Sequence, residues 1–230
     1  GGGFRLQSFQ PMKQEERDQA KVKGLDVQEF VLARDGLSVI THASNPLKTL
    51  IVEQIGRIYS GAVTNWKEVG GPDTPIVLYG RQTTSGTFVF FRDTVVKKDY
   101  AASMRTMEGN QAIVDAVKAD VNSIGYVGVG YVKDAAGQPR TDIHILAVGR
   151  DAKTLAVSPL DEPAVLRGDY PIFRPIYQYL SHIPAKNSVL DQFLRFEISD
   201  EGKKIITEAG FYTLTIADQK ENETLLQKMQ

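Results

Sequence analysis

The sequence predicts an α/β layered fold, because strand-like segments alternate along the chain with segments of helical periodicity. The strand-like segments are short, apolar and bounded by Gly, Pro, Asn or Asp, whereas the helical segments place apolar residues three or four positions apart. The length of 230 residues suffices for one large domain or for two lobes of about a hundred residues each.

The first half of the chain is expected to begin with a polar helix at residues 14–21, with early acids and later bases as the helix dipole prefers. Strands at residues 27–33 and 37–41 follow, separated by a turn-like break at Asp35-Gly36. The remaining elements of this half are a helix at 50–59 capped by Thr49, a strand at 75–79 and a helix from 87 to about 98.

The second half is expected to contain a helix at 110–118, a strand from 123, a strand at 143–148, an irregular stretch at 149–171, a strand at 174–180, and helices at 188–196 and 200–209. The ordered pattern ends near Tyr212. The charged tail beyond Asp218 is expected to be a loose or helical surface segment.

The composition excludes several classes of protein. Hydrophobic residues make up 42% and charged residues 24% of the chain, which is ordinary for a globular protein. A net charge of −1 provides no basic field for nucleic acid. The absence of cysteine excludes disulfides, thiolate metal sites and a cysteine nucleophile. No apolar run reaches the roughly 18 residues of a transmembrane helix.

The stretch at residues 79–88 has the chemistry of an oxyanion site. The first N–H groups of a helix lack internal partners, and the helix dipole places partial positive charge there. Ser85 and Thr87 add hydroxyl donors, and Gly86 lets the backbone approach a ligand. Arg81 offers a planar two-pronged donor to phosphate or carboxylate oxygens.

The stretch at residues 79–88 and several other residues also have interpretations that involve no anion. The same stretch also fits an ordinary helix cap at Ser85 or Thr84 with a surface arginine before it. Catalysis by Ser85 is disfavoured, because no His/Asp partner is visible and the motif is not a Gly-x-Ser-x-Gly elbow. Asp35 beside a strand could be a ligand or a turn residue, and Trp66 is expected to anchor its loop. The three histidines are far apart, so no metal site is predicted.

Five stretches of the sequence carry a family resemblance. They are Asn45-Pro46 to Gly70-Gly71, including Thr64-Asn65-Trp66-Lys67-Glu68-Val69; Arg81-x-x-x-Ser85-Gly86-Thr87; Asn110, Ile113 and Val117 with Ile124-Gly125-Tyr126 and Gly130-Tyr131; Tyr170-Pro171 with Arg174-Pro175-Ile176-Tyr177; and Glu201-Gly202, Ile205 and Gly210-Phe211. Together, over roughly residues 8–214, they resemble the phosphate-binding proteins of bacterial ABC phosphate-uptake systems.

The resemblance implies a two-lobed periplasmic-binding-protein fold of type II, with a ligand cleft between the lobes and a two-strand hinge near Leu37–Thr41 and Arg174–Tyr179. Lobe 1 would comprise residues 1–40 and 131–230, and lobe 2 residues 41–130. By the same resemblance, phosphate would contact four residues of lobe 2: Arg81, Ser85, Gly86 and Thr87.

The implied function is to bind inorganic phosphate, or another tetrahedral oxyanion, and to deliver it to the membrane permease of an ABC transporter. Such a protein is not an enzyme, needs no cofactor or metal, and is expected to be a monomer in the periplasm or outside the cell, with a lipid anchor in its precursor. The first alternative is an extracytoplasmic sensor or attachment protein of the same fold with weak, altered or lost anion binding. A phosphatase is a weaker alternative.

The chain departs from the family pattern in two ways, in the N-terminal part of lobe 1 and in the acidic residues expected near the ligand. The family has a further N-terminal segment whose Ser/Thr-rich turn donates to phosphate, so lobe 1 is expected to be incomplete, with Gly1-Gly2-Gly3 a possible remnant of a loop. Phe9 stands where relatives often have an acidic residue or serine, and Thr83 where they have aspartate. A carboxylate acceptor can read the proton of hydrogen phosphate, so discrimination from sulfate stays open. Ser8, Phe9 and Asp35 are the further candidate ligands.

Overall fold

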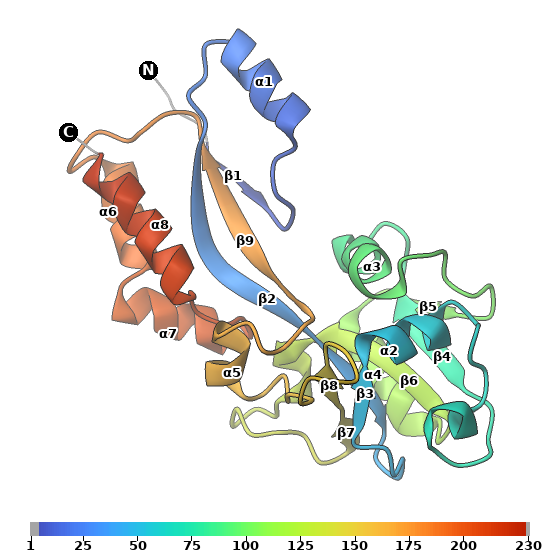
Figure 1. Cartoon of the computed structure of the whole chain (residues 1–230). Coiled ribbons are helices and arrows are strands. Elements are labelled where there is room, and N and C mark those ends of the chain that lie inside the picture. Colours follow the sequence, from blue (N-terminus) through green and yellow to red (C-terminus); the bar gives the residue numbers. More distant parts are fainter. Residues whose placement is uncertain (1–4, 229–230) are drawn as a thin grey trace. The chain divides into compact units, whose positions relative to one another are not determined.

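The computed structural model describes residues 5–228 and divides the chain into two compact units. The described part of unit 1 is residues 5–35 and 174–228, and unit 2 is residues 36–173. The chain passes into unit 2 within strand β2 (Gln28–His42) and returns at the start of strand β9 (Phe173–Leu180), both of which are labelled in Figure 1. The N-terminal glycines lie outside the described residues.

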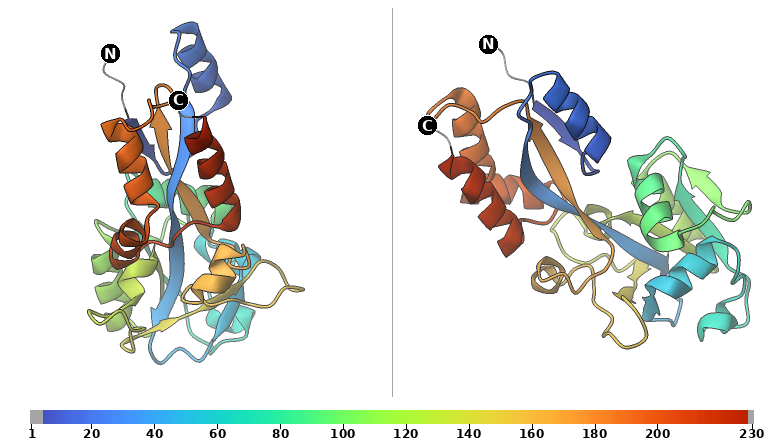
Figure 2. Two further views of the ribbon diagram at one scale, coloured as in Figure 1. Left: turned by 90° about the vertical axis from the view of Figure 1, so that its left-hand side faces the viewer. Right: turned by 45° about the horizontal axis from the view of Figure 1, so that its top comes forward.

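Unit 1 is a three-stranded ribbon with helices on one face. Strand β1 (Arg5–Ser8) pairs antiparallel with β9, and β9 neighbours the first half of β2. Figure 2 shows three helices on the same face of this ribbon: α6 (Val189–Glu197), α7 (Asp200–Glu208) and α8 (Ile216–Gln227). Apolar side chains from β2, β9, α6 and α8 form the core, namely Phe30, Leu180, Leu194, Leu225 and Leu226. Helix α1 (Gln14–Val22) has no buried residue.

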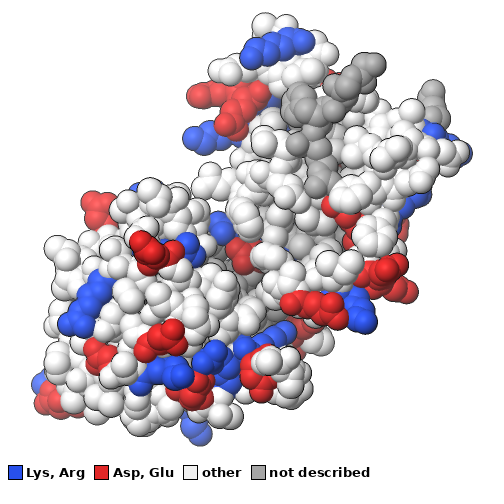
Figure 3. Space-filling model, turned by 180° about the vertical axis from the view of Figure 1, so that it is seen from behind, with Lys and Arg blue, Asp and Glu red and all other residues white. Residues whose placement is uncertain are grey.

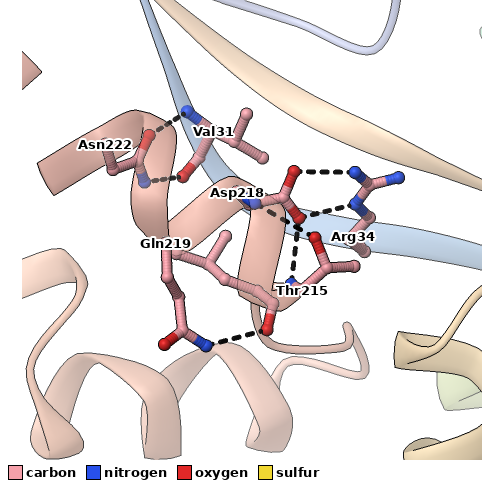
Figure 4. A network of polar contacts seen from close by, with 7 residues as sticks. Val31, Arg34, Thr215, Asp218, Gln219 and Asn222 are labelled. Atoms are coloured by element: carbon pink, nitrogen blue, oxygen red, sulfur yellow. Dashed lines mark hydrogen bonds and ion pairs between the residues drawn. The ribbon is translucent and has the colours of Figure 1, made fainter. Parts of the chain in front are cut away.

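Helix α8 forms most of the C-terminal tail. Of the two expected forms, a loose or a helical surface segment, the helical one is confirmed, but α8 is also anchored to β2 by side chains (Figure 4). Asn222 accepts from the Val31 N–H at 2.9 Å and donates to the Val31 carbonyl at 2.7 Å, so its amide satisfies both main-chain groups of a buried strand residue. Asp218 accepts from Arg34 Nε at 2.9 Å and Nη2 at 2.7 Å. A capping box between Thr215 and Asp218 starts the helix, and this motif is readable in the sequence.

Replacing Asn222 with alanine is expected to lower the free energy of unfolding by about 2–4 kcal/mol, because two buried main-chain groups of Val31 lose their partners. Chemical denaturation measures this change. The matched control is Glu223→Ala on the exposed face of the same helix, which is expected to change stability by no more than about 0.5 kcal/mol. Equal effects of both substitutions would contradict the anchoring role of Asn222.

Unit 2 is built on a mixed sheet. The second half of β2 pairs antiparallel with β6 (Ser123–Gly128) and β7 (Ile143–Ile145), while β4 (Val77–Arg81) lies parallel to both β6 and β5 (Arg105–Met107). Strands β3 (Thr49–Ile51) and β8 (Ala147–Gly149) form a separate parallel pair. The helical elements are α2 (Val52–Tyr59), η1 (Trp66–Val69), α3 (Gly86–Phe91), the π-helical turn η2 (Arg92–Val96), α4 (Asn110–Ala119), η3 (Val129–Val132) and α5 (Glu162–Leu166).

Two neighbouring residues of β6 show which helices cover which face of this sheet. A Cβ on Gly125 would lie 2.6 Å from Ile113 and 2.9 Å from Val117, so α4 packs directly against the backbone on that face. Successive residues of a strand point to opposite faces. Tyr126 accordingly packs on the other face against Phe91 of α3, with ring centroids 3.9 Å apart. The end of β4 and the start of α3 therefore lie on a well-packed framework.

Several expected elements differ from the structure. Residues 28–42 form one strand without a break at Asp35-Gly36, because Gly36 does not adopt a positive φ and the Asp35 carboxylate is held by Arg174 instead of closing a turn. The helix expected from residue 50 starts at Val52, since Thr49–Ile51 pairs with β8. The strand expected at 143–148 is two short strands with different partners, and the helix expected from 87 to about 98 continues after Phe91 as the π-helical turn η2.

The two units differ from the expected lobes in residues 36–40 and 131–173, which lie in unit 2. Strand β7 pairs with the second half of β2, and β8 pairs with β3, so these later segments are fixed to unit 2 by main-chain hydrogen bonds. The expected lobes as moving bodies stay a prediction.

The surface carries charges of both signs. In the face drawn in Figure 3, basic and acidic side chains are interspersed, in keeping with the net charge of −1. Among residues 5–228, no helix is both long and apolar enough to cross a membrane.

Candidate functional site

The candidate site is the connection from β4 to α3 in unit 2. Strand β4 buries Leu78 and Tyr79 and ends at Arg81. The Ser85 N–H donates to the Gln82 carbonyl at 3.0 Å, which closes a turn. Ser85 then caps α3, and its Oγ accepts from the Thr87 N–H at 3.2 Å. Local turn and capping chemistry thus places the hydroxyl of Ser85 at the helix start, four residues after the arginine.

The guanidinium of Arg81 has unused donors. Its Nε is buried and has no hydrogen-bond partner, and Nη1 lies 3.5 Å from the Asn110 Oδ1, at the long limit of a hydrogen bond. Within residues 5–228, no carboxylate forms an ion pair with it. A buried donor without a partner is unfavourable unless a ligand or ordered water supplies an acceptor.

The start of α3 is open for close approach. A Cβ on Gly86 would meet no atom of the surrounding structure within 4 Å, so there is open space beside this residue where its Cβ would stand. The Thr87 hydroxyl has no protein partner among the described residues. Since the Ser85 Oγ accepts from a backbone N–H, its own proton is available to a ligand. The stretch therefore combines a cation, two hydroxyl donors and a helix start, which favours an anion.

The three candidates in unit 1 have partners of their own. Ser8 Oγ forms a local turn, donating to the Gln10 carbonyl at 2.8 Å and accepting from the Gln10 N–H at 3.1 Å. The ring of Phe9 lies over the Arg174 guanidinium at 4.8 Å. Asp35 Oδ2 accepts from Arg174 Nε at 3.1 Å and Nη2 at 2.9 Å. Burial raises the pKa of Asp35, and the neighbouring guanidinium opposes that rise.

No metal site is evident. Within residues 5–228, no three or more His, Asp or Glu side chains are grouped closely enough to hold a metal ion. His42 and His182 each contact a nearby serine through Nδ1, at 2.8 and 2.9 Å. Trp66 is fully buried and donates to the Asn122 carbonyl at 3.0 Å, which confirms that it anchors its loop.

Asn110 and Tyr126 stand out in the sequence only as motif residues, and their contacts with Arg81 become evident in the structure. Asn110 begins α4, and Tyr126 lies on β6, so both reach Arg81 through the tertiary structure. The Arg81 N–H donates to the Tyr126 hydroxyl at 3.2 Å. A polar side chain at a helix start and a tyrosine in an apolar strand are the only local signals of these roles.

The fold is of the α/β class, and comparison with known proteins shows the family to which it belongs. The PBP superfamily domain family matches residues 8–201. The chain therefore belongs to the PBP superfamily.

Several similar proteins are named phosphate-binding proteins. The chain is 28% identical over 231 residues to protein SphX of Synechococcus elongatus, covering 93% of this chain and 66% of SphX. It is 28% identical over 198 residues to the phosphate-binding protein PstS of Pseudomonas aeruginosa, covering 80% of this chain and 59% of that protein. The chain thus spans about two thirds or less of the length of these curated relatives.

A solved structure gives the same result. A putative phosphate ABC transporter substrate-binding protein from Clostridium perfringens, crystallised with bound phosphate, superposes with a TM-score of 0.68 at 28% identity, covering 92% of this chain and 79% of that one. The expected α/β fold of periplasmic phosphate-binding proteins is confirmed by this similarity.

Proposed function

We propose that the chain binds inorganic phosphate and delivers it to the membrane permease of an ABC transporter. The observation that carries the proposal is the buried Nε of Arg81, which has no protein acceptor. In the sequence, Arg81 stands shortly before the helix start that Ser85 caps. The relatives named for phosphate binding support the choice of anion.

Binding in this proposal uses hydrogen bonds and charge, with no covalent step. Arg81 donates two parallel hydrogen bonds to two oxygens of the anion. Ser85 and Thr87 donate from their hydroxyls, and the main chain at Gly86 and Thr87 approaches the anion because no Cβ stands at residue 86. Ser8, Phe9 and Asp35 remain weaker ligand candidates, since Ser8 and Asp35 already have protein partners.

The proposal extends to the setting of the protein. A chain that hands phosphate to a permease works outside the cytoplasmic membrane, in the periplasm or at the cell surface, as a monomer and without enzymatic activity. The relatives named as ABC transporter substrate-binding or phosphate-binding proteins support this setting.

One observation favours a second function, an extracytoplasmic sensor or attachment protein with weak or lost anion binding. Thr83 is exposed and forms no hydrogen bond with Arg81 among the described residues, and the Phe9 ring packs on the Arg174 guanidinium. Neither residue supplies the carboxylate that would read the proton of hydrogen phosphate.

Isothermal titration calorimetry of the chain with phosphate and with sulfate distinguishes the two functions. Phosphate transport predicts saturable heat with phosphate at micromolar or lower concentration and weaker heat with sulfate. Equal binding of both anions would indicate an oxyanion site that does not recognise the proton of hydrogen phosphate. Absence of heat with either anion would refute the transport proposal and favour the sensor.

A further inference from the structure

Two tyrosines, the fully buried Tyr126 and the partly buried Tyr100, connect the arginine of the proposed phosphate site to the helix that carries the other donors. The Arg81 N–H lies 3.2 Å from the Tyr126 hydroxyl, which lies 3.1 Å from the Tyr100 hydroxyl, which in turn lies 2.9 Å from the Phe88 carbonyl. Phe88 belongs to the first turn of α3. This chain of three hydrogen bonds, the tyrosine relay, therefore joins the end of β4 to the start of α3 outside the connecting loop.

The direction of each hydrogen bond in the relay follows from its ends. The Phe88 carbonyl can only accept, so Tyr100 donates its one proton there. Tyr126 must then donate to Tyr100, and the Tyr126 oxygen accepts from the Arg81 N–H. Burial raises the pKa of both tyrosines, so both hydroxyls keep their protons at neutral pH.

The Tyr126 hydroxyl takes the place of a main-chain partner for Arg81. Strands β4 and β6 pair in parallel at Val77–Ser123 and Leu78–Ile124, and the pairing ends there. Three residues further on, the Arg81 N–H meets the Tyr126 side chain in place of a β6 carbonyl. Without this hydroxyl, the N–H at the end of the strand would be left without its acceptor.

Packing gives the relay little freedom to move. Tyr126 is fully buried, and its ring stacks on Phe91 at 3.9 Å with an interplanar angle of 10°. A Cβ on Gly80 would lie 2.6 Å from the Met104 sulfur and 3.1 Å from the Tyr126 hydroxyl, so a larger residue before the arginine would have to displace the Met104 side chain. Tyr59 packs edge-on against both Phe91 and Tyr126, at 5.1 and 5.4 Å.

We infer that Tyr126, supported by Tyr100, is a positioning residue that fixes Arg81 relative to the Ser85-Gly86-Thr87 helix start, so that both parts of the phosphate site are in place before the anion binds. The inference rests on the proposed function. Donors held in place before binding lose less conformational freedom on binding, and this raises affinity.

The test uses Tyr126→Phe and Tyr100→Phe in the whole chain, with Tyr170→Phe as the matched control. Like Tyr126, Tyr170 is fully buried in unit 2, and like Tyr100 it donates its hydroxyl to a main-chain carbonyl, that of Leu37, at 2.6 Å. Phosphate affinity is measured by calorimetry, stability by thermal unfolding, and the exchange rate of the Arg81 amide by NMR.

Tyr126→Phe is expected to weaken phosphate binding about tenfold, and Tyr100→Phe about threefold because Arg81 keeps its acceptor. The Arg81 amide is expected to exchange faster in Tyr126→Phe than in the parent chain. Tyr170→Phe should destabilise the protein comparably while changing affinity by no more than about twofold. An affinity loss in Tyr126→Phe no larger than that of the control would overturn the inference.

A failure of the proposed function gives a different result. If the parent chain binds no phosphate, the proposed function is refuted, and the positioning role for phosphate is refuted with it. If the parent chain binds phosphate but Tyr126→Phe binds equally well, only the relay is refuted. In that case, faster exchange of the Arg81 amide in Tyr126→Phe would show that the relay holds the backbone of Arg81 without contributing to phosphate binding.

Discussion

Replacing Arg81 with alanine is expected to weaken phosphate binding about a thousandfold or more while leaving the thermal unfolding temperature nearly unchanged. Binding falls because the substitution removes the only charged donor among the proposed ligands. Stability is retained because the side chain contributes little to the fold: Nε has no partner and Nη1 makes one long contact at 3.5 Å.

Two further variants make this result specific. Arg57→Ala removes an exposed arginine elsewhere in unit 2 and is expected to leave affinity unchanged. Arg81→Lys keeps the charge but loses the two-pronged geometry, so its affinity should lie between those of the parent chain and Arg81→Ala. Phosphate binding of parental strength in Arg81→Ala would show that the site lies elsewhere.

Replacing Arg174 with alanine is expected to lower the free energy of unfolding by about 3–5 kcal/mol, because it leaves the Asp35 carboxylate buried without its charged partner. Asp35 is 8% exposed and Arg174 is 5% exposed, so water cannot replace the guanidinium as the partner of the Asp35 carboxylate. The two residues are the last of β2 and the first of β9 that belong to unit 1, and their ion pair therefore joins these strands where both leave the unit.

The double variant Asp35→Ala/Arg174→Ala identifies the ion pair as the cause. With both charges gone, its loss of stability in urea denaturation should be smaller than the sum of the two single losses. Arg167→Ala is the control, since Arg167 and Asp169 form an exposed pair at 3.0 Å that is expected to contribute no more than about 1 kcal/mol. Additive losses at Asp35 and Arg174 would contradict a coupled buried pair.

Local chemistry explains which elements the sequence predicts well. The helices expected at residues 110–118 and 188–196 follow from apolar periodicity, and the structure has both within one residue, the second starting after its capping Ser188. The break at Asp35-Gly36 is wrong because a distant arginine holds the aspartate in an extended strand. The tail beyond Asp218 is helical, which is one of the two expected forms, but its anchoring could not be predicted because the role of Asn222 depends on a strand far away in the sequence.

The candidate site likewise contains residues that the local sequence predicts and residues whose role depends on the tertiary structure. Arg81, Ser85, Gly86 and Thr87 lie within seven consecutive residues, so turn and helix-start chemistry alone brings them together. The tyrosine relay could not be predicted, because Tyr126 looks like an ordinary core residue of an apolar strand until the end of the β4–β6 pairing is known. The roles of Ser8, Phe9 and Asp35 as ligands stay predictions.

The central claim is that the β4–α3 connection binds phosphate. An NMR titration of the isotope-labelled chain with inorganic phosphate tests it most directly, by following the Arg81 Nε–H and the amides of residues 85–87 together with all other amides. The account predicts that the Arg81 Nε–H and the amides of Gly86 and Thr87 shift the most and saturate along one binding curve. Saturable shifts that leave these groups unmoved, or no shifts at all, would contradict it.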